Sequence, residues 1–282
     1  MSIIQLPTDM TGPKDSFENI VTSCEALQAN EDLKTTMANV TDLFVRTANV
    51  LKVNLTRFFQ SVKRGELEKY CNDHGTVVRA IESLNYFNVK DTAIDSPLGM
   101  ATPYPKTVEN LSEALDGMKI ETFLDNALKS AKRIRQNLLN KEDAGKDIND
   151  LYTLAAAMKN SLGQSESKRN ESFDAKDHSY TFGKSFSSME EFRRTRIAAI
   201  DTEKYLYRID RINQLCGTIS GVFSDISDVR NPDISKPAAD HLAEAALVTA
   251  KVLDLYGNCC LDLMAVSHNM TIVINKLYQL AK

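Results

Sequence analysis

The sequence predicts an all-α fold, an elongated antiparallel helical bundle with coiled-coil-like heptad packing. Three observations lead to this prediction. The 282 residues include only 11 glycines and 7 prolines, which is poor material for a turn-rich β protein. Apolar residues recur at alternating steps of three and four over long stretches, and this spacing places them on one face of a helix. The hydrophobic content of 43% allows a chain of this length to bury a substantial core.

The N-terminal region is expected to begin with a short amphipathic helix around residues 17–27, followed by a long helix. Asn30 or Asp32 can cap the long helix, which continues toward Gly75. Its apolar stripe consists of Leu33, Met37, Val40, Phe44, Leu51, Leu55, Phe58 and Val62. Because this stripe keeps helical spacing, it is expected to pack against other helices.

Three further helices are expected before residue 163. A short one covers residues 76–84, and a longer one runs from Thr107 to a stop before Asp143. The stripe of the longer helix consists of Val108, Leu111, Leu115, Met118, Leu124, Leu128, Ala131 and Leu138. A last short helix covers residues 148–162, so that residues 1–162 form an N-terminal helical region.

The next long helix is expected to begin near Ser187 or Ser188 and to stop before Pro232. Glu190 and Glu191 would lie in its first turn, where the helix dipole favours negative charge. The residue before a proline avoids the α region, which sets the end of the helix. Its apolar stripe consists of Tyr205, Leu206, Ile209, Ile212, Cys216, Ile219, Phe223 and Ile226.

The last helix is expected to run from about residue 236 to the C-terminus, roughly 65 Å at 1.5 Å per residue. Ser235 is a candidate N-cap, and Pro237 suits the first turn. Its stripe consists of Leu242, Ala245, Thr249, Val252, Tyr256, Cys259, Leu263, Val266, Met270, Val273, Leu277 and Leu280. Together with the preceding helix it would form an antiparallel hairpin over residues 188–282. This hairpin would pack on the N-terminal region, as a second unit or within one domain.

Two stretches interrupt the helical pattern and are expected to be long loops, at about residues 85–106 and 163–187. The first contains three prolines, and the second is rich in serine and charge and would link the two helical regions. Loops of this length are uncommon within compact domains and often carry function. Their aromatic residues are therefore candidate contacts with partner proteins: Tyr104, Phe173, Tyr180, Phe182 and Phe186. The alternation of Tyr180 and Phe182 also allows a small hairpin.

The segment YGNCCLDLMAVSHNM, residues 256–270, groups two cysteines, an aspartate and a histidine. A membrane span fails on length, because the uncharged residues 263–275 cover about 20 Å of helix against a hydrocarbon core of roughly 30 Å. A metal site fails on geometry, because Cys259 and Cys260 point about 100° apart on a helix, and Cys259 and His268 lie on opposite sides. The sequence therefore predicts core packing here, with no metal and no cofactor.

The remaining candidate motifs for catalysis are incomplete. Gly183-Lys184-Ser185 precedes a helix like the end of a phosphate loop, but the glycine required five positions earlier is His178. Three of the four histidines follow an aspartate, yet neighbouring side chains on a helix do not converge on a metal. The sequence thus predicts a protein that is not an enzyme. An enzyme with a thiol nucleophile is a competing hypothesis, which requires one unusually reactive cysteine.

A basic cluster at Arg193, Arg194 and Arg196 is the candidate contact for phosphate groups or for a partner protein. Arginines of this kind bind nucleic-acid backbones through their charge. However, acidic residues such as Glu190 and Asp201 are interleaved with them, and mixed signs are typical of a solvated face. The net charge of −4 gives no further indication of a nucleic-acid partner. A nucleic-acid-associated helical protein is therefore the alternative hypothesis.

In overall character the chain resembles the α-helical accessory and structural proteins of tailed bacteriophages. The features that carry this resemblance are long helices, five cysteines without framework spacing, a start (MSIIQLPTDM) without a secretory signal, and the lack of an enzymatic motif. The resemblance implies a component of the virion, placed in a capsid or a tail. It concerns the whole chain and assigns no functional residue.

The expected function is that of a non-enzymatic structural or assembly protein. It would bind other protein subunits through its loops and helix faces, in a homo- or hetero-oligomeric assembly without a membrane span. The expected location is the cytoplasm of the producing cell, and the virion if a phage encodes the chain.

Overall fold

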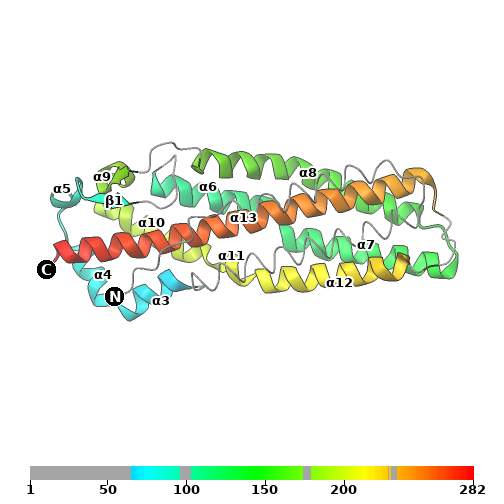
Figure 1. Cartoon of the computed structure of the whole chain (residues 1–282), viewed down its shortest axis with the longest axis horizontal. Helices are drawn as coiled ribbons and strands as arrows, with labels where there is room; N and C mark the ends of the chain where they lie inside the picture. The colour runs from blue at the N-terminus through cyan, green and yellow to red at the C-terminus, as the bar shows by residue number, and fades with distance from the viewer. Residues whose placement is uncertain (1–64, 96–102, 174–178, 228, 230–233) are drawn as a thin grey trace.

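The computed structural model describes residues 65–95, 103–173, 179–227, 229 and 234–282, and this part of the chain is mostly helical, as predicted. The helices lie along one long axis and give the molecule an elongated shape (Figure 1). In chain order the elements are α3 (Glu66–Asp73), α4 (Gly75–Glu82), α5 (Tyr86–Val89), β1 (Ala93–Asp95), α6 (Tyr104–Met118), α7 (Ile120–Asn140), α8 (Gly145–Phe173), β2 (Ser179–Thr181), α9 (Phe182–Ser185), α10 (Met189–Thr202), α11 (Lys204–Tyr207), α12 (Ile209–Ser227) and α13 (Lys236–Leu280). The helix predicted over residues 17–27 and the part of the next predicted helix before residue 65 lie outside the described residues. The expectation that this second helix continues unbroken toward Gly75 is wrong, because Gly65 has φ 65° and α3 begins only after it.

The longest element, α13, confirms the predicted C-terminal helix and extends along most of the long axis (Figure 1). It contains 45 residues, with Ser235 at the N-cap position and Pro237 in the first turn. The predicted stripe is buried from Leu242 to Leu277, while Leu280 at the end is 53% exposed. None of the described helices is both long enough and apolar enough to cross a membrane.

The stretch of α13 from Cys259 to Thr271 is buried on all sides, whereas the sequence predicted a single buried stripe. Every residue from Cys259 to Thr271 is buried, because α8, α6, α3, α4 and α10 all pack against this helix. A helix that is buried all round occupies the centre of its fold rather than one face of it. The buried set includes the polar residues Asp262, Ser267, His268, Asn269 and Thr271.

Helix α8 corrects the predicted loop at residues 163–187. The helix continues without interruption from Gly145 to Phe173, so the boundary placed after residue 162 falls inside it. The serines that suggested a loop are packed against α6: Ser165 donates to the carbonyl of Ala114 at 2.9 Å, and Asn110 donates to Ser172 at 3.1 Å. A serine can remain helical and buried when its hydroxyl has a partner, which composition alone does not reveal.

The predicted helix from Thr107 is divided into α6 and α7. Lys119 separates them with φ 42° and ψ 41°, the left-handed conformation, which interrupts the helical hydrogen bonding. Lys141 adopts the same conformation after α7, and the amide of Glu142 donates back to the carbonyl of Asn137 at 2.8 Å. Both turns are left-handed caps formed by lysine in place of the more usual glycine.

The predicted helix after Ser188 is divided into α10, α11 and α12. Its beginning is confirmed, because the Ser188 hydroxyl accepts from the amide of Glu191 at 3.1 Å and the Glu191 carboxylate accepts from the amide of Ser187 at 2.5 Å. Helices α12 and α13 run in opposite directions, as the hairpin prediction requires (Figure 1). Their main contacts are with other helices, however: α12 packs on α7, and α13 packs on α8.

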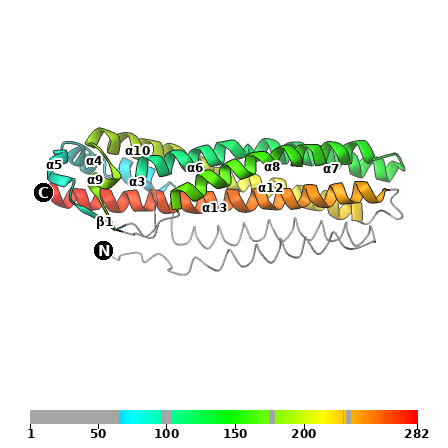
Figure 2. The same cartoon turned by 90° about the horizontal axis from the view of Figure 1, so that it is seen from above.

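The two short strands form a long-range antiparallel pair, with Ala93 opposite Thr181. The local hairpin predicted around Tyr180 and Phe182 is therefore wrong, since Tyr180 pairs with Ile94 and Phe182 begins α9. The predicted loop at 85–106 likewise contains α5, β1 and the first turn of α6. Figure 2, a view at 90° to the first, shows α5, α9 and β1 gathered at the end of the molecule where α13 terminates.

Replacing Leu263 with alanine should lower the free energy of unfolding by about 3 kcal/mol, because this side chain is 0% exposed and its removal leaves a cavity. Leu280→Ala on the same helix is the matched control. Its side chain is 53% exposed, so a loss of less than about 0.5 kcal/mol is expected. Chemical denaturation followed by circular dichroism measures both changes. Equal losses in the two variants would contradict the central position of α13.

Candidate functional site

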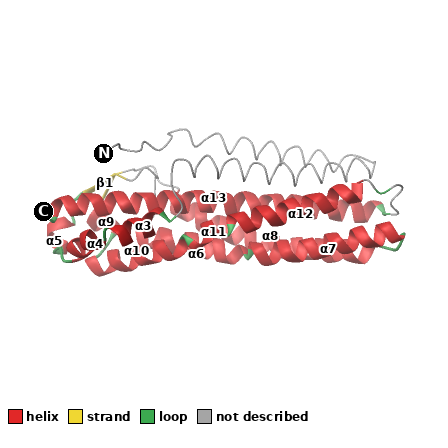
Figure 3. Ribbon diagram, turned by 90° about the horizontal axis from the view of Figure 1, so that it is seen from below, coloured by secondary structure: helices red, strands yellow, loops and turns green. Residues whose placement is uncertain are grey.

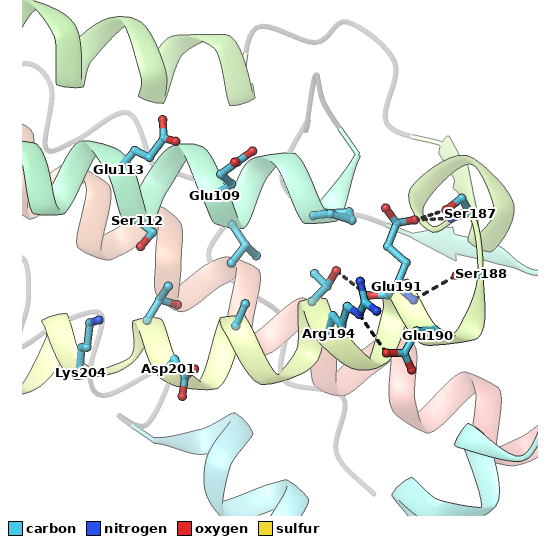
Figure 4. A pocket seen from close by; sticks show the side chains of 15 residues that line it. Glu109, Ser112, Glu113, Ser187, Ser188, Glu190, Glu191, Arg194, Asp201 and Lys204 are labelled. Atoms are coloured by element: carbon cyan, nitrogen blue, oxygen red, sulfur yellow. Dashed lines mark hydrogen bonds and ion pairs between the residues drawn. The ribbon is translucent and has the colours of Figure 1, made fainter.

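A groove of about 770 Å³ lies between α6 and α10 and is the main candidate for a binding site (Figure 4). Helices α6 and α10 pack against each other, and the groove follows their contact. Its lining residues are Pro105, Val108, Glu109, Ser112, Glu113, Ser187, Ser188, Glu190, Glu191, Arg194, Thr195, Ala198, Asp201, Thr202 and Lys204. Both helices lie in the half of the molecule that contains the C-terminus (Figure 1).

The lining divides into a buried floor and an exposed charged rim. Val108, Thr195 and Thr202 are buried, and Ala198 between them is half-buried. Most of the charged lining residues are exposed, and Figure 4 shows Glu109 and Glu113 on the side of α6 turned away from α10, and Glu190 and Asp201 on the side of α10 turned away from α6. Small side chains on the floor keep the groove open, while the rim gives it charge.

The lining contains five carboxylates and two cations. The carboxylates of Glu109 and Glu113 form ion pairs at 2.8 and 2.9 Å with Lys106 and Lys168, which are outside the lining. Hydrogen bonds from Arg193 and Arg194 lower the pKa of Glu190 to about 2, and the hydrogen bond from Lys168 lowers the pKa of Glu113. These two groups therefore stay ionised over the physiological range. Exposed ion pairs contribute little net free energy, so a ligand can replace one partner at small cost.

The predicted arginine cluster does not form a common surface. Arg193 and Arg194 both bind the carboxylate of Glu190 at 2.9 Å. Arg196 points away from them, binds Glu82 of α4 at 2.5 Å, and has a side chain that is only 12% exposed. The prediction that Arg196 contacts a partner or a phosphate is therefore wrong, because its guanidinium joins α10 to α4 inside the fold. Arg194 lies in the groove.

Three of the five aromatic residues proposed as partner contacts are in the core. Tyr104, Phe182 and Phe186 are at most 1% exposed and form one cluster with Phe192, with ring centroids 5.0–5.6 Å apart. The expectation of a surface role is wrong for these three, since burial of aromatic area is what holds α6, α9 and α10 together. The side chains of Phe173 and Tyr180 lie outside the described part of the structure.

The four described cysteines, Cys71, Cys216, Cys259 and Cys260, are buried. For Cys259 and Cys260 this agrees with the core packing predicted for residues 256–270. Burial raises the pKa of each thiol, to about 12 for Cys216. Asp262 binds Arg169 at 2.5 Å, and His268 lies 3.1 Å from the Glu66 carboxylate. The described residues contain no group of three or more histidine, cysteine or carboxylate side chains that could hold a metal ion. Cys24 lies outside the described residues.

Sequence reasoning missed a buried carboxylate at Glu203, between α10 and α11. It is 2% exposed and lies at the N-terminus of α3, whose N-cap residue Gly65 has φ 65° and no side chain. Burial raises the pKa of Glu203 to about 7, although the backbone amides of Leu67 and Glu68 oppose the shift. The carboxyl group thus caps a helix that is remote in sequence. No local pattern around residue 203 indicates this role.

The sequence predicted only some of the residues that line the groove. Arg194 was predicted as a contact residue, but the α6 wall was not, because Glu109 and Glu113 look like ordinary polar positions on an exposed helix face. The wall becomes a candidate site only through the long-range packing of α6 on α10.

Comparison with known proteins gave no match to the chain from any protein-family model, curated protein or solved structure.

The buried thiols should react slowly. In a Cys24→Ser variant, alkylation of the native protein near neutral pH should be on the order of a hundredfold slower than alkylation in denaturant, because access requires opening of the fold. Mass spectrometry of partly labelled protein measures each cysteine separately. One cysteine that reacts as fast in the native state as in denaturant would favour the hypothesis of a thiol nucleophile.

The raised pKa of Glu203 should make stability depend on pH. Between its ordinary pKa near 4.5 and its folded pKa of about 7, the folded state holds the proton more tightly than the unfolded state. The free energy of unfolding should therefore fall by up to about 3 kcal/mol as the pH rises through this window. Glu203→Gln should remove this part of the dependence, measured by denaturation at pH 5 and pH 8. Identical pH profiles for the variant and the wild type would contradict the assignment.

Proposed function

We propose that the chain is a non-enzymatic structural or assembly protein that binds other protein subunits, with the groove between α6 and α10 as a docking site. The observation that carries the proposal is the groove itself: an open volume of about 770 Å³ with a small-residue floor and a charged rim. Protein interfaces combine a close-packed centre with a polar, hydrated edge, and this groove offers both. Figure 3 shows the almost wholly helical body on which it lies.

Rigidity supports this function. Binding is tighter when the receptor does not have to order itself, and both walls of the groove pack on the buried helix α13. The heptad spacing of α13 fits knobs-into-holes packing along its length, which would hold α6 and α10 in fixed register. The aromatic cluster of Tyr104, Phe182, Phe186 and Phe192 closes one end of the same region.

The proposed setting is a bacteriophage particle, in its capsid or its tail. This part of the proposal follows from the resemblance of the sequence to helical structural proteins of tailed phages. An elongated helical body with a lateral docking groove suits a protein that spaces or connects other subunits. A role in binding nucleic acid has less support, because Arg193 and Arg194 are both paired with the carboxylate of Glu190, and the side chain of Arg196 is mostly buried.

Filling the groove with a large side chain should prevent partner proteins from binding to the chain. Ala198→Trp places a large side chain among the lining residues, while Ala156→Trp on the exposed side of α8 is the matched control. Affinity purification of tagged wild type and variants from the producing cells, read by quantitative mass spectrometry, should give a defined set of partner proteins. This set should persist with Ala156→Trp and be lost with Ala198→Trp. Circular dichroism and thermal unfolding establish that both variants fold.

Two results would contradict the proposal. Equal recovery of partners by both tryptophan variants would mean that the groove is not an interface. Recovery of DNA or RNA that salt removes, without protein partners, would favour the nucleic-acid hypothesis instead.

A further inference from the structure

Helix α3 is held to the rest of the described structure at few points. Two of its eight residues, Leu67 and Cys71, are buried, and the helix packs on α13 and α4. A polar contact at 3.1 Å joins Glu66 to His268 of α13. Parts of a fold with few buried apolar contacts open locally before the whole molecule unfolds. We therefore expect α3 to open at a lower cost in free energy than the buried residues 259–271 of α13.

Both ends of α3 are breaks in the helical backbone. Gly65 precedes the helix with φ 65°, a left-handed conformation, and His74 separates it from α4 with φ −119° and ψ 33°. Turns of this kind at the ends of an element absorb the change in backbone angles when the element moves. Helix α3 can therefore move away from α13 while α4 keeps its place.

The carboxyl group of Glu203 lies at the N-terminus of α3 and lacks a compensating charge. The residue is 2% exposed, and its Oε2 atom is buried without a hydrogen-bond partner among the described residues. Two cations near it in the chain or the fold are engaged elsewhere: Arg196 binds Glu82 at 2.5 Å, and Lys204 lies over the ring of Tyr205 at 5.0 Å. Burial without a partner costs an ionised carboxylate more free energy than a neutral carboxyl group. The titratable and charged groups of the surrounding elements are Glu66, Glu68 and Cys71 on α3, Glu82 on α4, Arg196 on α10, Lys204 and Tyr207 on α11, and His268 on α13.

We propose that α3 is a pH-sensitive latch, which stays closed over Glu203 while this carboxyl group is protonated and opens when the group ionises. Opening uncovers Leu67 and the surface of α13 around His268, which Glu66 contacts in the closed state. The inference does not depend on the groove between α6 and α10.

The direction of the response follows from the two environments of the carboxyl group. Under the closed helix, burial raises the pKa of Glu203 to about 7. In the open state the group meets water, and its pKa returns toward the ordinary value of 4.5. The closed state thus binds the proton more tightly, so the latch is most stable below pH 4.5 and loses stability as the pH rises through 7. Between pH 5 and pH 8 the open fraction rises on the order of fiftyfold.

Hydrogen–deuterium exchange of the full chain, read by mass spectrometry at pH 5 and pH 8 and corrected for the intrinsic rate at each pH, tests the latch. The amides of α3 should exchange faster than those of residues 259–271 at both pH values, because α3 opens without the core. Protection of the α3 amides should fall on the order of fiftyfold from pH 5 to pH 8. In Glu203→Gln, whose side chain is neutral at every pH, α3 should stay protected at pH 8.

Two further variants serve as controls. Asp210→Asn removes one negative charge at an exposed position of α12 and should keep the pH response of the wild type. Leu67→Ala weakens the apolar contact of α3 and should raise its exchange by the same factor at both pH values. Three results would each overturn the inference: equal protection of α3 at pH 5 and pH 8, a wild-type response in Glu203→Gln, or equal exchange of α3 and residues 259–271. The first and third come from the wild type alone and do not require that Glu203→Gln folds.

Discussion

The burial of residues 259–271 of α13 on all sides is the constraint on which the rest of the structure depends. A helix in this position has to bring its polar residues into the interior, and a buried charge is costly unless it is paired. Asp262 meets Arg169 of α8, and His268 meets Glu66 of α3. The hydroxyl of Thr271 donates a hydrogen bond to the carbonyl of His268 within the same helix. Each of these contacts has a specific geometry. Burial of apolar side chains therefore supplies the stability, while the polar pairs fix the positions of α8 and α3 relative to α13.

The groove is a secondary consequence of this arrangement. Helices α6 and α10 both pack on α13, and the aromatic cluster joins them at one end. Small residues such as Ala198 and Thr202 then keep their outer faces from closing over the contact. Both walls pack on α13 through their buried faces, and most of the charged side chains on the rim are exposed and do not contribute to the hydrophobic core.

The sequence predicted those parts of the fold that depend on periodic burial. The stripe of α13, its start near Pro237 and the cap at Ser188 follow from local spacing and local hydrogen bonds. The failures share a different cause. Ser165 and Ser172 look like loop residues because serine is common in loops, yet both are buried in α8 and have hydrogen-bond partners on α6.

The site was harder to predict than the fold for the same reason. Arg196 belongs to a surface cluster by sequence, yet its partner Glu82 is brought to it by the packing of α4 on α10. The groove joins residues from two helices that are far apart in the chain. Lys119 divides a helix although no glycine or proline marks the position. A single sequence contains the residues of such features but not the pairing between them.

The carboxyl group of Glu203 at the start of α3 has a consequence for the order in which the molecule forms. An eight-residue helix is marginal on its own, and this one begins at a glycine that offers no cap. During synthesis the ribosome adds residues 66–73 long before residue 203. The carboxyl group of Glu203 is therefore absent when the α3 segment is made. The native contact at the N-terminus of α3 can therefore form only after residue 203 has been synthesised.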